Sequence, residues 1–299
     1  MIQTIFLNKL ITRLKNEIRM ILTSNQIESF HQNGFLLLDN FFDQKELNDF
    51  RDAVTKIIRV NLLKASKDDH PEINTSDLVG KELHEGITAL EKVDHKFIAD
   101  VYDTISFIPQ FLRITSKVEI SQCINQLTDR DLNSPTYIDQ SRCRIDQPFD
   151  PYNRMVPWHQ EVVYYVPGSD FVQTWAPLII DATIVNGTIQ ICPASHSEIT
   201  KQSYHEGEGD DYRYIVDEDV IKKYNPISLE MKLGQLLIFD SKLIHRSGKN
   251  ESSQTRYSLV GINHNIVNEQ FTPPRFVVKN RDKIMNDYYK ELQPSEQDI

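Results

Sequence analysis

The first third of the chain, from Thr23 to about Ser116, has the pattern of helices. Apolar residues recur there at intervals of three and four, which places them on one face of a helix. The pattern predicts helices near Ser24–Gln32, Gln44–Leu63 and Ile87–Arg113, one strand-like run at Gly34–Leu38, and a polar surface loop at Lys64–Ser76. We therefore expect a helical layer ahead of the rest of the fold.

Beyond Tyr137 the pattern changes to short runs of β-forming residues separated by Gly, Pro, Asn and Asp. Runs bounded by turn residues in this way predict strands. The expected strands are Gln140–Asp146, Trp158–Tyr165, Phe171–Ile180, Thr188–Cys192, Ser228–Lys232, Gln235–Phe239, Lys242–His245 and Arg256–His264. Because these strands follow the helices rather than alternate with them, we expect an antiparallel sandwich or barrel with helices over one face.

The two ends of the chain differ from this central part. Residues 1–22 have the pattern of an amphipathic helical leader, either packed or frayed, or lying on a membrane surface. A single domain is expected over residues 23–292, ending with a helix at Arg281–Leu292, and residues 293–299 form a polar tail. No stretch predicts a transmembrane span or a secretory signal.

Composition and charge narrow the class of protein. A chain of 299 residues, 39% of them hydrophobic, can bury a large core. Its formal net charge of −10 argues against nucleic acid or an anionic membrane as a partner, since both need a basic surface, and so favours a small-molecule substrate. Cys123, Cys143 and Cys192 lie far apart and form no C-x-x-C motif, which favours a reducing, cytoplasmic location.

His159 and Glu161 are candidate metal ligands. In a strand, residues two apart point to the same side, so both side chains would enter one cavity while Gln160 points away. His245, at the end of a later predicted strand, would complete a set of two histidines and one carboxylate. Such a facial triad leaves positions open on iron(II) for a co-substrate and for O2, so the three residues predict a mononuclear non-haem iron oxygenase.

The His-x-acid pattern is weak by itself. In a chain with 9 histidines and 43 acidic residues, about 1.3 such pairs arise by chance, and this chain has three. The pairs that begin at His70 and His196 lie in a polar loop and at a turn. Only His159 is flanked by β-forming residues, and for that pair alone a hydrogen-bonded core histidine explains the sequence equally well.

The residues that follow His245 favour the metal interpretation. Ser247 comes two positions later, and Arg256 and Ser258 share one face of the next predicted strand. Arginine has a planar fork that binds a carboxylate through two hydrogen bonds, which is what the far end of 2-oxoglutarate requires. The spacing therefore predicts a carboxylate clamp beside the metal.

Several stretches taken together resemble the phytanoyl-CoA dioxygenase family of iron(II)- and 2-oxoglutarate-dependent oxygenases, from roughly Ile27 to Ile262. They are Gly34–Leu38, Gln140–Arg142, Trp158–Glu161, Trp175–Leu178, Asn186–Gly187, Pro193–His196 and His245–Gly248, leading to Arg256. The resemblance implies a mainly β fold with flanking helices and a double-stranded β-helix, or cupin-like jelly-roll, core. It also implies a hydroxylation in which 2-oxoglutarate and O2 are consumed and succinate and CO2 are released.

The resemblance also assigns roles to individual residues. The matches are His159, Glu161 and His245 to the metal ligands, Arg256 to the 2-oxoglutarate clamp, and Trp175 and Ser247 to the co-substrate pocket. The run Gln140–Arg142 is similar to the ectoine hydroxylase branch, where a Gln touches 2-oxoglutarate and an Arg touches the substrate carboxylate. We therefore expect Arg142 and Arg144 to bind an anionic group of the substrate. A salt-bridged pair at a sheet edge is the alternative for these two arginines.

Glu161 departs from the family, whose carboxylate ligand is usually Asp. The extra methylene lengthens the reach by roughly 1.5 Å, although Glu remains a hard oxygen ligand and argues against a halogenase. Two alternatives to a hydroxylase stay open. One is a catalytically silent β-helix binding protein that uses Glu161 structurally, and the other is a cupin-like metal enzyme, such as an isomerase, that needs neither Arg256 nor 2-oxoglutarate.

Overall fold

The computed structural model describes residues 22–67, 70, 72–148, 155–165, 168–206, 212–269 and 271. The leader predicted before Leu22, the helix predicted at Arg281–Leu292 and the polar tail lie outside the described residues. The side chain of Gln140 is also outside the description, although its backbone is part of a strand. Among the residues described, no helix is long and apolar enough to cross a membrane.

A layer of helices comes first in the chain. It consists of α2 (Ser24–Asn33), α3 (Gln44–Lys67), α4 (Ile87–Val93), α5 (His95–Ile105), α6 (Pro109–Thr115) and α7 (Val118–Leu127), with a π-helical turn at Glu82–Gly86. The prediction of one helix over Ile87–Arg113 was wrong, because Asp94 caps the start of α5 and Pro109 starts α6. The loop predicted at Lys64–Ser76 is helical as far as Lys67.

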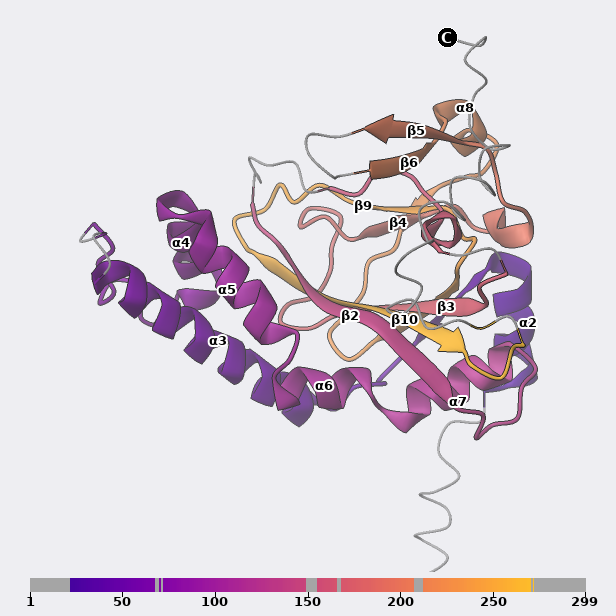
Figure 1. Cartoon of the computed structure of the whole chain (residues 1–299), viewed down its shortest axis with the longest axis horizontal. Helices are drawn as coiled ribbons and strands as arrows, with labels where there is room; N and C mark the ends of the chain where they lie inside the picture. Colours follow the sequence, from indigo (N-terminus) through magenta and orange to yellow (C-terminus); the bar gives the residue numbers. More distant parts are fainter. Residues whose placement is uncertain are drawn as a thin grey trace, which may run out of the picture.

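The strands form two facing sheets and a hairpin. They are β1 (Phe35–Leu38), β2 (Thr136–Asp146), β3 (Phe171–Pro177), β4 (Ile189–Ile191), β5 (Gln202–Glu206), β6 (Tyr212–Val216), β7 (Ile227–Ser228), β8 (Leu236–Asp240), β9 (His245–Ser247) and β10 (Arg256–Asn265). The large sheet has the order β1-β8-β3-β10-β2, the small sheet has the order β7-β4-β9, and β5 pairs with β6. Figure 1 shows helices α3 to α7 on one side of the large sheet, with the small sheet and the hairpin on the other.

The interior strands β3 and β10 of the large sheet are largely buried on both faces. On β10, Tyr257 and Leu259 pack into the main core with the helices, whereas Arg256 and Val260, at the alternate positions, line a cavity on the opposite face. A second apolar cluster, which contains Trp175 and lies between the two sheets, closes the other side. This arrangement confirms the predicted fold, a mainly β double-stranded β-helix with flanking helices.

Strand β2 contains a bulge that the sequence did not reveal. Arg142 pairs with Val260 of β10, but the next pair along the ladder is Asp139 with Ile262. Two residues of β2, at positions 140 and 141, therefore stand opposite the single residue between Val260 and Ile262. The bulge interrupts the alternation from Arg142 to Gln140 and places Asp139 opposite a cavity-lining residue.

The prediction of a strand at Trp158–Tyr165 was also wrong. His159 forms an isolated antiparallel bridge, after which the chain turns into a 3-10 helix at Glu161–Tyr164. The buried side chain of Gln160 explains the turn in part, because its amide is hydrogen-bonded to Glu198 O and Lys242 O. Helices α7 and α8 (Glu218–Ile221) and the β5–β6 hairpin were not predicted.

Candidate active site

His159 and His245, which are far apart in sequence, form an antiparallel bridge with each other. The N–H of His159 donates to the carbonyl of His245 at 3.1 Å, and the N–H of His245 donates to the carbonyl of His159 at 3.0 Å. Residues directly opposite in an antiparallel pair carry neighbouring side chains. The two imidazole centroids are accordingly 4.2 Å apart.

The backbone also fixes the orientation of each imidazole. The Nδ1 of His159 lies 2.8 Å from Pro157 O, and the Nδ1 of His245 lies 2.8 Å from Leu243 O. A carbonyl can only accept, so each Nδ1 carries a proton, and in the neutral form of the ring Nε2 is the nitrogen that can bind a metal. Metal-binding histidines are typically held in this way. Burial lowers the pKa of His245 well below its usual value, and His159 lowers it further, which favours the neutral ligand form.

Glu161 completes the predicted set, although not from a strand. One of its carboxylate oxygens lies 3.3 Å from the Nε2 of His159, and the three potential ligand atoms all lie within 4.8 Å of one another. Two neutral imidazoles and one carboxylate are a donor set that suits iron(II). The residues therefore fit the metal that the sequence predicts.

The triad opens into a cavity of about 450 Å³ between the two sheets. Four arginines line it, whereas Glu161 is the single acidic residue among the described lining residues. The arginines are Arg142, Arg144, Arg246 and Arg256. In a chain with a net charge of −10, the cavity lining is thus locally rich in cationic side chains.

Arg256 lies at the wall of this cavity and is almost completely buried. Its Nε donates to Asn186 O at 3.1 Å, its Nη1 donates to Ser258 Oγ at 3.2 Å, and the ring of Trp175 lies 5.4 Å away. Burial lowers the pKa of Arg256, while Asp146 opposes that shift. The result is a fixed, desolvated guanidinium in the position expected of a carboxylate clamp.

The structure brings together most of the predicted site residues. Trp175, Ser247 and Arg256 line the cavity with the triad, and Ser258 is connected to it through Arg256. Arg142 and Arg144 also line the cavity from β2. Features of the alternative, a salt-bridged pair at a sheet edge, are present as well. Among the described strands β2 is the outermost of the sheet, and Arg144 pairs with Asp146 at 3.0 Å.

Three polar residues of this region were not predicted. Gln173 lines the cavity, and its buried Nε2 has no hydrogen-bond partner among the described residues; its position two residues before Trp175 would have indicated the shared face. Asp146 could have been found by the same alternation from Arg144. Asp139, whose carboxylate accepts a hydrogen bond from the hydroxyl of Tyr165 at 3.2 Å, was hidden by the bulge.

A triad of two histidines and one carboxylate, inside a double-stranded β-helix and beside a buried arginine, defines the class of non-haem iron oxygenases. The family model for phytanoyl-CoA dioxygenase (PhyH) matches residues 30–258. The chain therefore belongs to the phytanoyl-CoA dioxygenase family, as its motifs predicted, and is a dioxygenase.

Two relatives illustrate this membership. The ectoine dioxygenase of Bordetella bronchiseptica is 21% identical over 281 residues, which cover 85% of this chain and 79% of that protein. The phytanoyl-CoA dioxygenase of Arabidopsis thaliana is 22% identical over 261 residues, which cover 79% of this chain and 87% of that protein.

Solved structures support the fold. EctD from S. alaskensis, solved with 2-oxoglutarate and 5-hydroxyectoine, has a TM-score of 0.56 at 15% identity, covering 93% of this chain and 87% of that chain. The epimerase SnoN, solved with Fe3+, alpha ketoglutarate and nogalamycin RO, has a TM-score of 0.53 at 10% identity, covering 81% of this chain and 82% of that chain.

Proposed function

We propose that the enzyme uses iron(II) and 2-oxoglutarate to hydroxylate a small polar substrate that carries an anionic group, releasing succinate and CO2. The observation that carries this proposal is the presence of the triad and the buried Arg256 in one arginine-lined cavity. An isomerase of the cupin type would need the metal ligands but would not need a buried guanidinium beside them.

His159, Glu161 and His245 would hold the metal. Bound iron(II) would supply the redox chemistry that couples O2 to the decarboxylation of 2-oxoglutarate and the oxidation of a substrate C–H bond. The protein fixes each imidazole through its Nδ1 contact, so the ligands need little reorganisation when the metal binds.

Arg256 would bind the distal carboxylate of 2-oxoglutarate. Its contacts with Asn186 and Ser258 hold the guanidinium in place, and Trp175 covers one side of it. A preorganised fork of this kind binds a carboxylate in one orientation and so directs the other end of the molecule toward the triad. Ser247 and the predicted Gln140 would complete this pocket.

Arg142 and Arg144 would supply the positive charge for the anionic group of the substrate. The acidic surface repels anions at long range, but salt screens that repulsion beyond about 8 Å at physiological ionic strength. Arg142 and Arg144 act at closer range, and the partly buried Arg144 is also screened less, whereas Arg142 is exposed. The unpaired amide of Gln173 supports a substrate that also offers a hydrogen-bond acceptor near the triad.

The test is formation of succinate from 2-oxoglutarate by protein purified anaerobically and loaded with iron(II). The candidate panel would contain small carboxylates and zwitterions, including ectoine because a relative is named for it. Substrate-stimulated succinate formation that is lost in His159→Ala supports the proposal. Stoichiometric iron binding without any succinate would favour the isomerase alternative, and absence of iron binding would favour a silent binding protein.

A further inference from the structure

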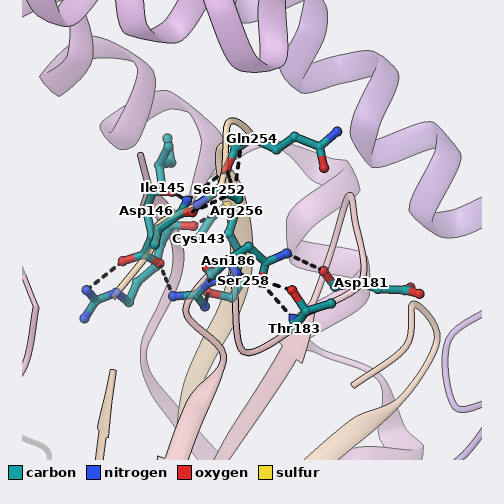
Figure 2. A network of polar contacts seen from close by, with 12 residues as sticks. Cys143, Ile145, Asp146, Asp181, Thr183, Asn186, Ser252, Gln254, Arg256 and Ser258 are labelled. Carbon is teal, nitrogen blue, oxygen red and sulfur yellow. Dashed lines mark hydrogen bonds and ion pairs between the residues drawn. The ribbon is translucent and has the colours of Figure 1, made fainter. Parts of the chain in front are cut away.

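The carboxylate of Asp146 lies next to the guanidinium of Arg256, the group that we propose binds 2-oxoglutarate. Asp146 Oδ2 is 3.0 Å from Arg256 Nη2 (Figure 2). Asp146 Oδ1 is 3.0 Å from Arg144 Nη2. The side chains of Arg256, Asp146 and Arg144 are 2%, 15% and 25% exposed, so solvent screens their charges only in part. Asp146 is thus a built-in anion at the co-substrate anchor.

Asp146 is fixed at this position by the sheet and not by its side chain alone. It is the register partner of Arg256 in the β2–β10 ladder, and its carbonyl accepts a hydrogen bond from Asn250 Nδ2 at 2.8 Å. Figure 2 shows Asp146 and Arg256 together with Ser258 and Asn186 in one polar network. An incoming carboxylate would therefore bind beside Asp146 rather than in its place.

The donors of Arg256 leave room for such a ligand. A guanidinium has five N–H bonds. Nε and Nη1 each donate one hydrogen bond, to Asn186 and Ser258, and Nη2 forms an ion pair with Asp146, so among the contacts of the described residues at least two N–H bonds remain for a ligand. Asp146 thus affects the anchor in two ways: it holds Nη2 in position, and it cancels one of the two positive charges that Arg256 and Arg144 bring to this corner.

We propose that Asp146 is a positioning residue that orients the anchor and weakens its affinity for dicarboxylates. The inference rests on the proposed function, in which 2-oxoglutarate binds at Arg256. Because 2-oxoglutarate and succinate share the same distal carboxylate, Asp146 lowers the affinity for both by the same factor. A weak anchor lets the product succinate leave, while the keto acid end still distinguishes the co-substrate.

The experiment titrates iron-loaded, anaerobic protein with 2-oxoglutarate and, separately, with succinate. Tryptophan fluorescence is the signal, because the chain has 2 tryptophans and Trp175 lies beside Arg256. Asp146→Asn keeps the size and the acceptor oxygen and removes the charge. We expect the Kd values of both ligands to fall about tenfold, the order expected from one unit charge at this range, with their ratio unchanged.

Two further variants separate charge from general structure. Arg144→Gln removes a positive charge from the same corner and should raise both Kd values. Asp170→Asn removes the carboxylate of another ion pair, Arg130–Asp170 at 2.9 Å, which does not line the cavity, and should leave both Kd values unchanged. The effect of Asp146→Asn should also shrink at high salt, which a purely structural role would not produce.

Equal or weaker binding of both ligands by Asp146→Asn would overturn the inference, as would an equal gain in Asp170→Asn. If Asp146→Asn does not fold, an unchanged or tightened affinity in Arg144→Gln overturns it independently. A wild-type protein that does not bind 2-oxoglutarate, or an Arg256→Lys variant that binds it as tightly as the wild type, would contradict the proposed function instead.

Discussion

The backbones of His159 and His245 are hydrogen-bonded to each other in both directions, with N···O distances of 3.1 and 3.0 Å. The main chain therefore brings the two candidate ligands together without help from their side chains. Replacing either imidazole should remove a ligand while leaving this bridge in place, so the metal site can be tested without loss of the fold.

Loss of either imidazole should abolish metal binding. We expect His159→Ala and His245→Ala each to lose the weak visible absorption band that appears when 2-oxoglutarate is added to anaerobic, iron-loaded protein. His196→Ala is the matched control, because His196 belongs to the same His-x-Glu pattern but lies in the 3-10 helix at Ser195–Ser197 and does not line the cavity. An unchanged band in both ligand variants would remove the assignment.

Glu161→Asp should weaken iron binding, although Asp is the usual residue of the family. Glu161 extends from the first residue of a 3-10 helix, and its carboxylate reaches to 3.3 Å from the Nε2 of His159. Shortening the side chain withdraws the oxygen, and we expect the affinity to fall by about tenfold to a hundredfold, the range typical of altered support around a ligand. Isothermal titration with iron(II) measures this, and equal or tighter binding would show that the longer side chain is not required.

Arg256→Lys should raise the concentration of 2-oxoglutarate needed for half-maximal turnover by about tenfold or more, because a lysine is a point charge that cannot reproduce the planar grip. Iron affinity should stay the same, since Arg256 is not part of the triad. An equal fall in both affinities would make Arg256 a structural residue.

Arg142→Ala should raise the KM for the substrate while substrate-free decarboxylation of 2-oxoglutarate continues near its normal rate. Charge-assisted hydrogen bonds contribute roughly 1.5 to 3 kcal/mol each, so the rise should be at least tenfold. The two rates are measured side by side as succinate formed with and without substrate. Normal kinetics in this variant, or a neutral substrate, would contradict the role of Arg142.

His264 should make the protein less stable in mild acid. Burial lowers the pKa of His264 below its usual 6.5, while Asp139 and Asp170 oppose the shift. Below that usual value the unfolded chain takes up the proton more readily than the folded one, so the free energy of unfolding falls as the pH falls. His84 and His245 contribute in the same direction.

Replacement of His264 by Phe should therefore reduce the acid-side loss of stability without removing it. The apolar ring should fit, because Tyr165 and Phe171 already pack against His264 at centroid distances of 5.1 and 5.0 Å. Urea unfolding at pH 7.5 and pH 5.5 gives the comparison. An identical pH dependence in the variant would show that His264 is not one of the groups responsible.

The predictions from the sequence succeeded where the chemistry depends on order along the chain. The order of the motifs led to the expectation that His159, Glu161, His245 and Arg256 lie together, and the structure does bring them to one cavity, while their roles stay predictions. The segment with His159 and Glu161 was assigned to a strand because alternate residues of a strand share a face, and this was wrong, since the buried amide of Gln160 and the surrounding fold override the β preference of its neighbours.

The bulge in β2 could not have been predicted. It inserts one residue near Gln140 and Ser141 without a glycine or proline to indicate it. Because of the bulge, Asp139 pairs with Ile262. Counting every second residue from Arg142 would have placed Asp139 on the other face of the strand. Contacts made across the sheet, which a single sequence does not contain, decide which residues of this strand share a face.

The proposed substrate residue Arg142 and the proposed co-substrate residue Arg256 lie on strands that are held differently in the large sheet. Arg256 lies on β10, which is hydrogen-bonded to β2 on one side and to β3 on the other, whereas β2 has a sheet neighbour on one side only among the described strands. Substitutions near Arg142 therefore alter a strand that is held on one side only, whereas Asp146, at the other end of β2, contacts Arg256 and ties that end to the interior strand. If Arg142 binds the substrate as we propose, changes in this part of the border strand should alter substrate choice more than they alter the reaction.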